Sequence, residues 1–288
     1  MLDTTPTVTV IMTTFNSSET VERAVQSVME QDYPHIELLV VDDASTDNTP
    51  EVVRGLMQKY KDHRYKFSFM QNPTNVGTYV SKNRAIQAAA GDYITGHDSD
   101  DTAEKNYVTT LMKPHIEQIP NVKITAVECA ARSGASRNDG TPRTVFCCIS
   151  QCFSKELVNE MGYFDSVRFA ADSEFYKRCK RVFGTRSVVR IQKLLYNVVR
   201  TQTSLTGDSK TGFHSKPRKY YVSQFTKWHK TSTREALLKA FRKFPLKVRP
   251  FPVHDESVRG LPRVREAVRL MPWHRRLKKN KFNKPTNK

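Results

Sequence analysis

The sequence predicts an α/β protein with a mostly parallel mixed sheet flanked by helices, followed by a basic and mainly helical C-terminal extension. Over the first 209 residues, short apolar runs alternate with amphipathic helical stretches, which predicts the layered sheet. Residues 210–288 contain 23 Lys and Arg against 4 acidic residues, whereas residues 1–209 contain 24 basic and 25 acidic residues. We therefore divide the chain into a near-neutral body, residues 1–209, and a basic extension, residues 210–288, with a mobile end.

The body consists of repeated strand and helix units. Each expected strand is a short apolar run, and each expected helix carries apolar residues at helical spacing. Ser17 or Ser18 caps the first helix, Thr49 begins the second, and Gly162 and Gly184 end the last two. In chain order we expect a strand at residues 8–12, a helix from 17 or 18 to 29, a strand at 36–41, a helix at 49–60, a strand at 65–70, a helix at 80–90, a strand at 93–95, a helix at 107–119, strands at 122–127 and 145–149, helices at 155–161 and 173–183, and a strand at 188–195.

Acidic side chains lie where the expected strands end. Asp42 and Asp43 follow the second strand, and Asp98, Asp100 and Asp101 follow the fourth. The carboxyl ends of parallel strands meet at one edge of a sheet, where ligands bind. Three carboxylates within four residues repel one another, so this acidic tetrad (residues 98–101) predicts a divalent cation, Mg²⁺ or Mn²⁺, whose shell is completed by water and substrate phosphate oxygens. The alternative is a solvated acidic turn that caps the next helix.

Five segments in a fixed order make the sequence similar to a known family. They are residues 8–16, 40–47, 75–77 with 81–83, 98–101 and 164–174. Through them the chain resembles the family 2 glycosyltransferases, and the resemblance extends from Val8 to about Thr206. It implies the GT-A fold and an enzyme of polysaccharide biosynthesis that transfers a sugar from a nucleoside diphosphate sugar, here a UDP-sugar, to a hydroxyl of a glycan or lipid-linked acceptor.

The resemblance implies a nucleotide site at the ends of the first two strands. Thr14 and Phe15 correspond to residues that hydrogen-bond and pack against the base, and an aromatic ring at a strand end also offers a stacking face. A core position is the alternative for Phe15. Asp42 and Asp43 correspond to carboxylates that accept hydrogen bonds from base or ribose, which suits side chains that accept without donating.

The resemblance assigns the diphosphate and the metal to later segments. It implies that Asp98 contacts ribose and metal and that Asp100 coordinates the metal, Mn²⁺ or Mg²⁺. Lys82 stands where the family usually has Arg, so it keeps a positive charge near the diphosphate but lacks the guanidinium fork. Residues 196–206 resemble the family's flexible loop over the diphosphate, in which Arg200 can pair with phosphate oxygens. A surface Arg is the alternative.

An acceptor hydroxyl needs a base that takes its proton during attack. The family uses an acid at the start of a late helix, usually in a Glu-Asp pair, and Asp172 corresponds to its second member while Ala171 replaces the first. Glu174 is the reserve base, and a helix N-cap is the alternative role for Asp172. One base without an evident nucleophile predicts direct displacement with inversion.

The basic extension has two interpretations. Its Lys and Arg residues, interleaved with aromatics such as Tyr221, Phe225, Trp228 and Phe241, fit a surface that lies against an anionic membrane. The alternative is a helical subdomain that packs on the body. A nucleic-acid-binding tail is the rival function, although it has no recognised readout motif and the acidic crevice would repel a polyanion. We expect no nucleic acid partner, and a metal-dependent nucleotidyltransferase is the rival among transferases.

The five cysteines form an odd set without a regular framework, so we expect free thiols in a reducing compartment. No apolar run approaches the roughly 18–20 residues that a spanning helix needs, and residues 1–12 lack a signal-peptide pattern. These features predict a cytoplasmic protein, peripheral on the inner face of the membrane if the extension binds there.

Overall fold

The computed structural model describes residues 5–130, 144–199, 210–261 and 265–266. Its centre is an eight-stranded sheet in the order β3-β2-β1-β4-β8-β6-β7, with β9 also paired to β6. The strands are β1 (Val8–Thr14), β2 (Ile36–Asp42), β3 (Lys66–Gln71), β4 (Tyr93–Asp98), β6 (Ile124–Ala130), β7 (Thr144–Phe146), β8 (Cys152–Ser154) and β9 (Val188–Leu194). The β3-β2-β1-β4 half is parallel, whereas β8 runs antiparallel to both β4 and β6. The predicted mostly parallel mixed sheet is confirmed.

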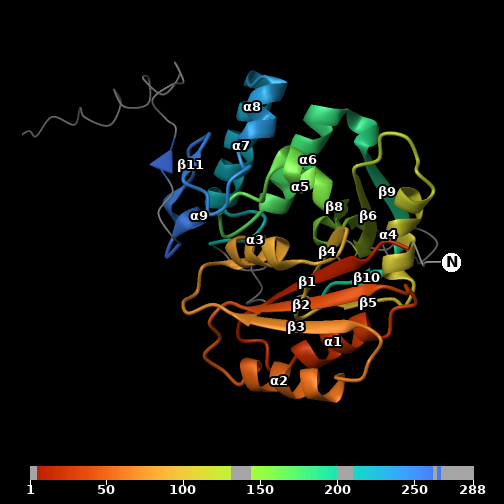
Figure 1. Ribbon diagram of the computed structural model, residues 1–288. Coiled ribbons are helices and arrows are strands. Elements are labelled where there is room, and N and C mark those ends of the chain that lie inside the picture. Colours follow the sequence, from red (N-terminus) through yellow and green to blue (C-terminus); the bar gives the residue numbers. More distant parts are fainter. Residues whose placement is uncertain (1–4, 131–143, 200–209, 262–264, 267–288) are drawn as a thin grey trace, which may run out of the picture.

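Helices cover both faces of the sheet (Figure 1). One face carries α1 (Val21–Met29), α2 (Thr49–Lys59) and α4 (Tyr107–Ile116), and the other carries α3 (Thr78–Ala88), α5 (Lys155–Met161) and α6 (Ala171–Phe183). In β1, Val8, Val10 and Met12 belong to the core under α1, α2 and α4, whereas Ile11 belongs to the core under α3, α5 and α6. Successive side chains of a strand point to opposite faces, so a strand covered on both sides is apolar throughout.

The region after β6 differs from the expectation. The expected strand at residues 145–149 is confirmed only at residues 145–146, because β7 ends at Phe146 and a 3-10 turn, Cys148–Ser150, leads into β8. Strands of three residues are too short for an alternating pattern to reveal them. The start of α1 also differs, because the Ser17 carbonyl accepts the Val21 N–H in a preceding turn, and neither Ser17 nor Ser18 caps the helix.

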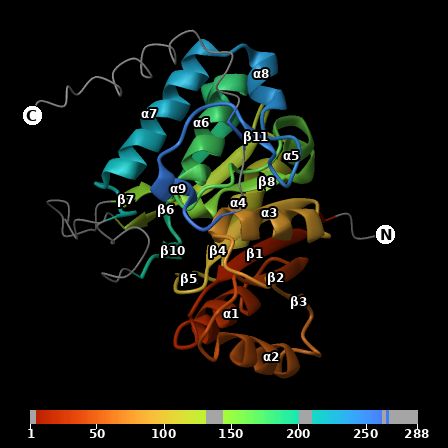
Figure 2. The ribbon, with the colours of Figure 1, turned by 90° about the vertical axis from the view of Figure 1, so that its left-hand side faces the viewer.

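The basic extension packs on the body. It contains α7 (Lys216–Thr231), α8 (Arg234–Lys239), β11 (Val248–Arg249) and α9 (Asp255–Val258), and both views place α7 beside α6 (Figure 1 and Figure 2). Tyr221, Phe225, Trp228 and Phe241 are each at most 3% exposed and belong to the core that α3, α5 and α6 share. Their assignment to a membrane surface is therefore wrong, since their helical spacing marks a packing face.

Membrane contact through the remaining basic residues stays a prediction. Among the residues that the structure describes, no helix is long and apolar enough to cross a bilayer. The expected mobile end of the extension lies mainly outside the described residues.

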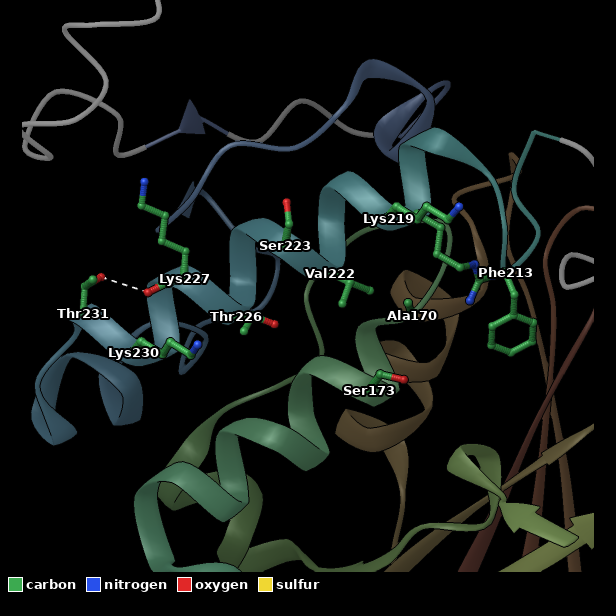
Figure 3. Close-up of a pocket in the computed structure, with 11 residues that line it drawn as sticks. Ala170, Ser173, Phe213, Lys219, Val222, Ser223, Thr226, Lys227, Lys230 and Thr231 are labelled. Atoms are coloured by element: carbon green, nitrogen blue, oxygen red, sulfur yellow. Dashed lines mark hydrogen bonds between the residues drawn. The ribbon is translucent and has the colours of Figure 1, made fainter.

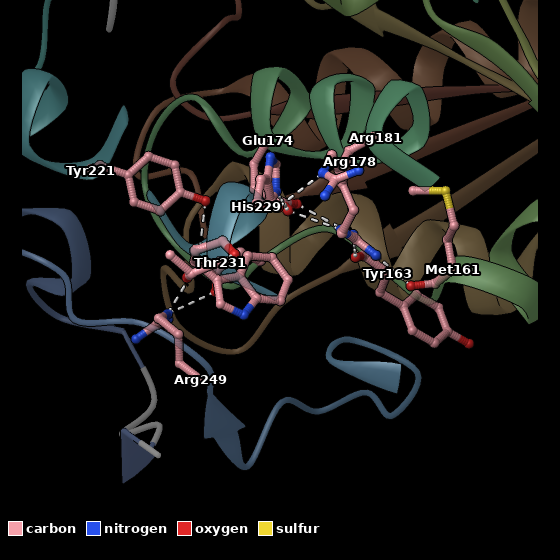
Figure 4. A network of polar contacts seen from close by, with 11 residues as sticks. Met161, Tyr163, Glu174, Arg178, Arg181, Tyr221, His229, Thr231 and Arg249 are labelled. Carbon is pink, nitrogen blue, oxygen red and sulfur yellow. Dashed lines mark hydrogen bonds and ion pairs between the residues drawn. The ribbon is translucent and has the colours of Figure 1, made fainter. Parts of the chain in front are cut away.

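Buried ion pairs fasten the extension to the body (Figure 4). Arg249 Nε lies 2.8 Å from an oxygen of Asp165, and both side chains are at most 2% exposed. On α6, Glu174 pairs with Arg178 at 2.9 Å, and His229 Nε2 of α7 lies 2.9 Å from the same carboxylate. Charges removed from water require such partners, so these contacts fix how α6, α7 and β11 are placed.

Candidate active site

The order of the strands creates a crevice beside β1. The chain places β2 and β3 on one side of β1 and then returns to place β4 on the other side. Ligands bind outside the carboxyl ends of the strands at such a switch point. The register pairs Thr14 with Asp42 and Thr13 with Asp98. Three strand ends therefore bring residues from distant segments to one edge of the sheet.

The loop after β1 presents the two residues assigned to the nucleotide base. Phe15 is 48% exposed, so the alternative core position is wrong, and an exposed aromatic residue at this edge is compatible with stacking on a base. Thr14 is buried, and within the described residues its Oγ1 has no hydrogen-bond partner. A buried hydroxyl without a partner is costly, which suits a position that a ligand completes.

The two carboxylates after β2 are buried and hold loops. Asp42 accepts hydrogen bonds from the N–H and the hydroxyl of Ser45. Asp43 accepts four hydrogen bonds from residues 72–81, among them the Gly77 N–H at 2.8 Å and, within α3, the Ser81 hydroxyl at 3.0 Å. Gly77 has a φ of 81°, in the region that favours glycine. Asp43 thus positions the start of α3, and the contacts of both carboxylates with base or ribose stay predictions.

The acidic tetrad combines an accessible carboxylate with two that are largely buried. The Asp98 side chain is 41% exposed, and Lys82 Nζ lies 3.2 Å from its Oδ1. Burial and the neighbouring Asp98 raise the pKa of Asp100 to about 6. Burial, Asp98 and Asp100 together raise the pKa of Asp101 to about 8, and Asp101 accepts the Val199 N–H at 2.8 Å. The tetrad therefore concentrates negative charge that a cation would stabilise.

The tetrad fits a cation that is held only partly by protein. Within the described residues no group of three or more His, Cys, Asp or Glu could hold a metal ion. Asp98 and Asp100 can supply two carboxylates, which suits Mg²⁺ or Mn²⁺ completed by water and phosphate oxygens. A solvated turn would leave Asp101 exposed, whereas it is 2% exposed. His97 is an unsuitable ligand, because it is fully buried and both ring nitrogens have partners, Nδ1 at 2.9 Å from the Asp98 carbonyl oxygen and Nε2 at 3.4 Å from the Ser27 hydroxyl.

A short two-stranded sheet holds the chain before residue 200 against the tetrad. It pairs β5 (Thr102–Ala103) with β10 (Tyr196–Asn197) in antiparallel fashion. The Tyr196 hydroxyl accepts the Asp98 N–H at 2.8 Å, and the bond from Val199 to Asp101 lies three residues further on. Sequence reasoning missed Tyr196, since a two-residue strand leaves no pattern. Arg200 lies outside the described residues, so its diphosphate contact stays a prediction.

Asp172 is connected to the tetrad through two side chains. It lies near the start of α6 and is half-buried. Burial together with the negative charge of the Asp172 carboxylate holds the pKa of Tyr79 well above its usual value, so the two side chains are close enough to interact. Lys82 Nζ lies 5.4 Å from the centroid of the Tyr79 ring while it also contacts Asp98. The contacts from Asp98 through Lys82 and Tyr79 to Asp172 therefore form one continuous path.

The alternatives around Asp172 do not hold. Glu174 is buried and bound to Arg178 and His229, so it is wrong as a reserve base. Two residues along a helix rotate the side chain by about 200°, which directs Glu174 into the core when Asp172 faces outward. The N-cap role is also wrong, because Ala170 occupies the N-cap position of α6.

A cavity of about 670 Å³ lies between α6 and α7 (Figure 3). On the α6 side it is lined by Ala170 and Ser173, which flank Asp172 in the chain. On the α7 side, Arg218 lines it, and the pKa of this guanidinium is lowered by burial against the opposing effect of Tyr79 and Asp172. The cavity thus adjoins the predicted base.

The model of the family "Glycosyl transferase family 2" matches residues 9–162, which is more than half of the 288 residues. The chain belongs to glycosyl transferase family 2. The matched part of this family 2 chain contains Lys82 and the tetrad and ends before Asp172. Curated relatives are named as glycosyltransferases, in agreement with the predicted enzyme class. The chain spans from 34% to 65% of the length of the first three relatives it matches.

One relative of the family 2 chain is the GalNAc(5)-diNAcBac-PP-undecaprenol beta-1,3-glucosyltransferase of Campylobacter jejuni, 35% identical over 108 residues, which are 38% of this chain and 34% of the relative. The mannosyltransferase PcManGT from Pyrobaculum calidifontis, solved with GDP-Man and Mn²⁺, has a TM-score of 0.57 and 22% identity over 69% of this chain and 58% of its own. S. aureus TarS 1–349, solved with UDP, has a TM-score of 0.56 and 19% identity over 77% of this chain and 65% of its own. The two structures confirm the fold that the resemblance implied.

Proposed function

We propose that this chain transfers a sugar from a nucleoside diphosphate sugar, a UDP-sugar, to a hydroxyl of a glycan or lipid-linked acceptor, with inversion. The observation that carries the proposal is the path of contacts from Asp98 through Lys82 and Tyr79 to Asp172. It supports a site in which a cation stabilises the leaving group and a carboxylate accepts the proton of the incoming hydroxyl. Similar folds solved with UDP and GDP-Man support the class of donor.

On the donor side, the accessible ring of Phe15 stacks on the base and the Thr14 hydroxyl finds its missing partner there. The Lys82 ammonium lies next to the diphosphate, where its charge stabilises the oxygen that leaves the anomeric carbon. Because Lys82 is largely buried, this interaction is screened less by water than a surface contact would be.

Asp98 and Asp100 would hold the divalent metal ion. When bound, such an ion would supply positive charge to the leaving diphosphate. The tetrad concentrates negative charge, and among the described residues Lys82 is its one ion-pair partner, which supports this assignment.

On the acceptor side, Asp172 is the general base. The acceptor oxygen attacks the anomeric carbon, its proton passes to the Asp172 carboxylate, and the bond from that carbon to the diphosphate oxygen breaks. The neighbouring Tyr79 hydroxyl orients the carboxylate. Attack from the side opposite the leaving group inverts the configuration.

Release of UDP from a panel of UDP-sugars by the full chain tests the proposal, with Mn²⁺ and with chelator. Asp172→Asn should lower transfer by about 10²–10⁴-fold, because a positioned base contributes that much. UDP affinity, measured by calorimetry, should stay unchanged in this variant, and Asp62→Asn on the exposed surface is the matched control. An unchanged transfer rate in Asp172→Asn would show that Asp172 is not the general base.

The same assay separates the rival functions. A nucleotidyltransferase would release pyrophosphate from a nucleoside triphosphate instead of UDP from a sugar nucleotide. Asp100→Asn should reduce the stimulation by Mn²⁺, and equal stimulation in this variant would remove its metal role. If the full chain binds an oligonucleotide and its affinity falls steeply as the salt concentration rises, the nucleic-acid-binding alternative is favoured.

A further inference from the structure

The start of β8 lies at the same edge of the sheet as the acidic tetrad. β8 is antiparallel to β4, and the register pairs Cys152 with Thr95, within the strand that leads to the tetrad. The 3-10 turn before β8 also packs closely on β4, since a Cβ at Gly96 would lie 2.8 Å from the Ile149 carbonyl oxygen. A glycine in a strand allows such a close approach of a second backbone. Gln151, between this turn and β8, therefore lies beside the strand that carries the tetrad.

The Gln151 side chain joins two segments of the chain. Gln151 is 2% exposed. Its Nε2 donates to the Cys148 carbonyl at 2.8 Å and to the Asp172 carbonyl at 3.1 Å. Both partners are acceptors, so the atom between them must be the amide nitrogen, and both of its N–H groups are used. Gln151 thus ties the main chain of the predicted base to the sheet edge that carries the tetrad.

The first turn of α6 has further contacts that place the carboxylate. The Cys148 Sγ lies 3.5 Å from the Ser173 hydroxyl oxygen, which gives the 3-10 turn a second contact with α6. The Asp172 carboxylate accepts the Ser173 N–H at 2.7 Å, so its position follows that of its own main chain. A side chain that holds the Asp172 main chain therefore also places the carboxylate.

The oxygen of the Gln151 amide opposes folding. Among the described residues, this Oε1 has no hydrogen-bond partner although it is buried. A buried acceptor without a partner is costly, and an apolar side chain of similar size would avoid that cost. The amide therefore stabilises the fold less than two hydrogen bonds usually do. Its distinct contribution is the link between Asp172 and the sheet.

We propose that Gln151 is a positioning residue for the general base, and that its amide fixes where Asp172 lies relative to the cation site of the tetrad. The inference rests on the proposed function, since it takes Asp172 as the base. The tetrad is placed by β4 and Asp172 by α6, and β8 with Gln151 connects the two. The base must lie within hydrogen-bond reach of the attacking hydroxyl, and a displacement of about 1 Å can cost about 100-fold in rate. Gln151 acts on this geometry through the main chain of Asp172.

Gln31 is a matched control for Gln151. It is also 2% exposed. Its Nε2 donates to the Ser27 and Glu104 carbonyls at 2.9 and 2.8 Å, and its Oε1 accepts the Val108 N–H at 3.0 Å. Gln31 thus fastens the start of α4, and its amide oxygen has a partner.

Gln→Met at each position separates positioning from stability. Methionine is similar in size and cannot donate to the carbonyls. In the UDP-release assay, Gln151→Met should lower kcat by about 10–100-fold and change UDP affinity by less than about twofold, because the donor site keeps its groups. Its urea midpoint should fall less than that of Gln31→Met, which loses three hydrogen bonds and removes no unpartnered atom. Gln31→Met should therefore lose more stability and less activity. Gln151→Asn, whose amide is one methylene too short to reach both carbonyls, should lower kcat as well.

The same substitutions combined with Asp172→Asn test whether Gln151 acts through the base. The effects of two residues that act as a unit are not additive. Gln151→Met should lower the residual rate of Asp172→Asn by less than about twofold, because no base remains to be positioned. Gln31→Met should lower the rate by the same factor in both backgrounds.

The outcomes separate the two proposals. An unchanged kcat in Gln151→Met and Gln151→Asn, or a loss that multiplies with that of Asp172→Asn, would overturn the positioning role while a slow Asp172→Asn still supported the base. Losses of kcat that follow the losses of stability in the two methionine variants would overturn it too, since Gln151 would then act on folding alone. A full rate in Asp172→Asn by itself would overturn the base and this inference together, and UDP binding would still support the donor site.

Discussion

Two glycines at helix ends allow the position of the extension on the body to be tested by substitution. Gly162 follows α5 and Gly184 follows α6, with φ angles of 83° and 90°. A Cβ at Gly162 would lie 2.2 Å from the carbonyl carbon and oxygen of Phe241 in the extension, whereas a Cβ at Gly184 would meet nothing within 4 Å. The Tyr163 N–H also donates to the Phe241 carbonyl at 2.8 Å, so the backbones are in direct contact there.

Gly→Ala at each position should therefore have different effects. Both variants force alanine into a sparsely populated conformation, which costs about 1–3 kcal/mol. Gly162→Ala must also displace the backbone around Phe241, which adds about 1–3 kcal/mol as in overpacked cores. Urea unfolding followed by circular dichroism should give a lower free energy of unfolding for Gly162→Ala than for Gly184→Ala. Equal losses in the two variants would show that the extension does not occupy this position.

Three further predictions concern charges. Arg249→Met leaves Asp165 buried without its partner and should lower the free energy of unfolding by about 3–5 kcal/mol at pH 8. The loss of unfolding free energy should be smaller at pH 5, because burial raises the pKa of Asp165 and the variant can fold with this carboxyl protonated. Equal losses in urea titrations at both pH values would contradict this prediction. Burial opposes ionisation of Asp47, but hydrogen bonds from Thr49 outweigh it and lower the pKa of Asp47 to about 2. The ionised carboxylate stabilises the fold by about 1 kcal/mol above pH 4, and this stabilisation is lost as the pH falls toward 2. Asp47→Asn should therefore narrow the difference in urea midpoint between pH 7 and pH 3. An unchanged difference would refute the stabilising role of the Asp47 carboxylate. Lys82→Gln should weaken UDP binding by at least about tenfold in calorimetry, as for loss of a charge-assisted contact, and full affinity would remove Lys82 from the donor site.

The edge of the sheet could be predicted from the sequence. The apolar runs of β1, β2 and β4 are local, and the parallel arrangement of strands places their carboxyl ends together whatever their exact register. The sequence therefore predicts that Asp42 and Asp98 lie at the same edge of the sheet. The helix stops at Gly162 and Gly184 were likewise visible, because the signal lies within a few residues.

The sequence by itself determined which residues share a helix face or a strand end, since these depend on short and regular spacings. Only the tertiary structure decided what each face contacts. The aromatic stripe of α7 has the same spacing whether it meets a membrane or a core, and packing against α6 selected the core, which left the lysines on the cavity side. The partnership of Asp165 with Arg249 spans 84 residues, and the path from Lys82 through Tyr79 to Asp172 also joins separate segments. Such contacts depend on how whole helices are placed, and no local pattern of residues specifies that placement.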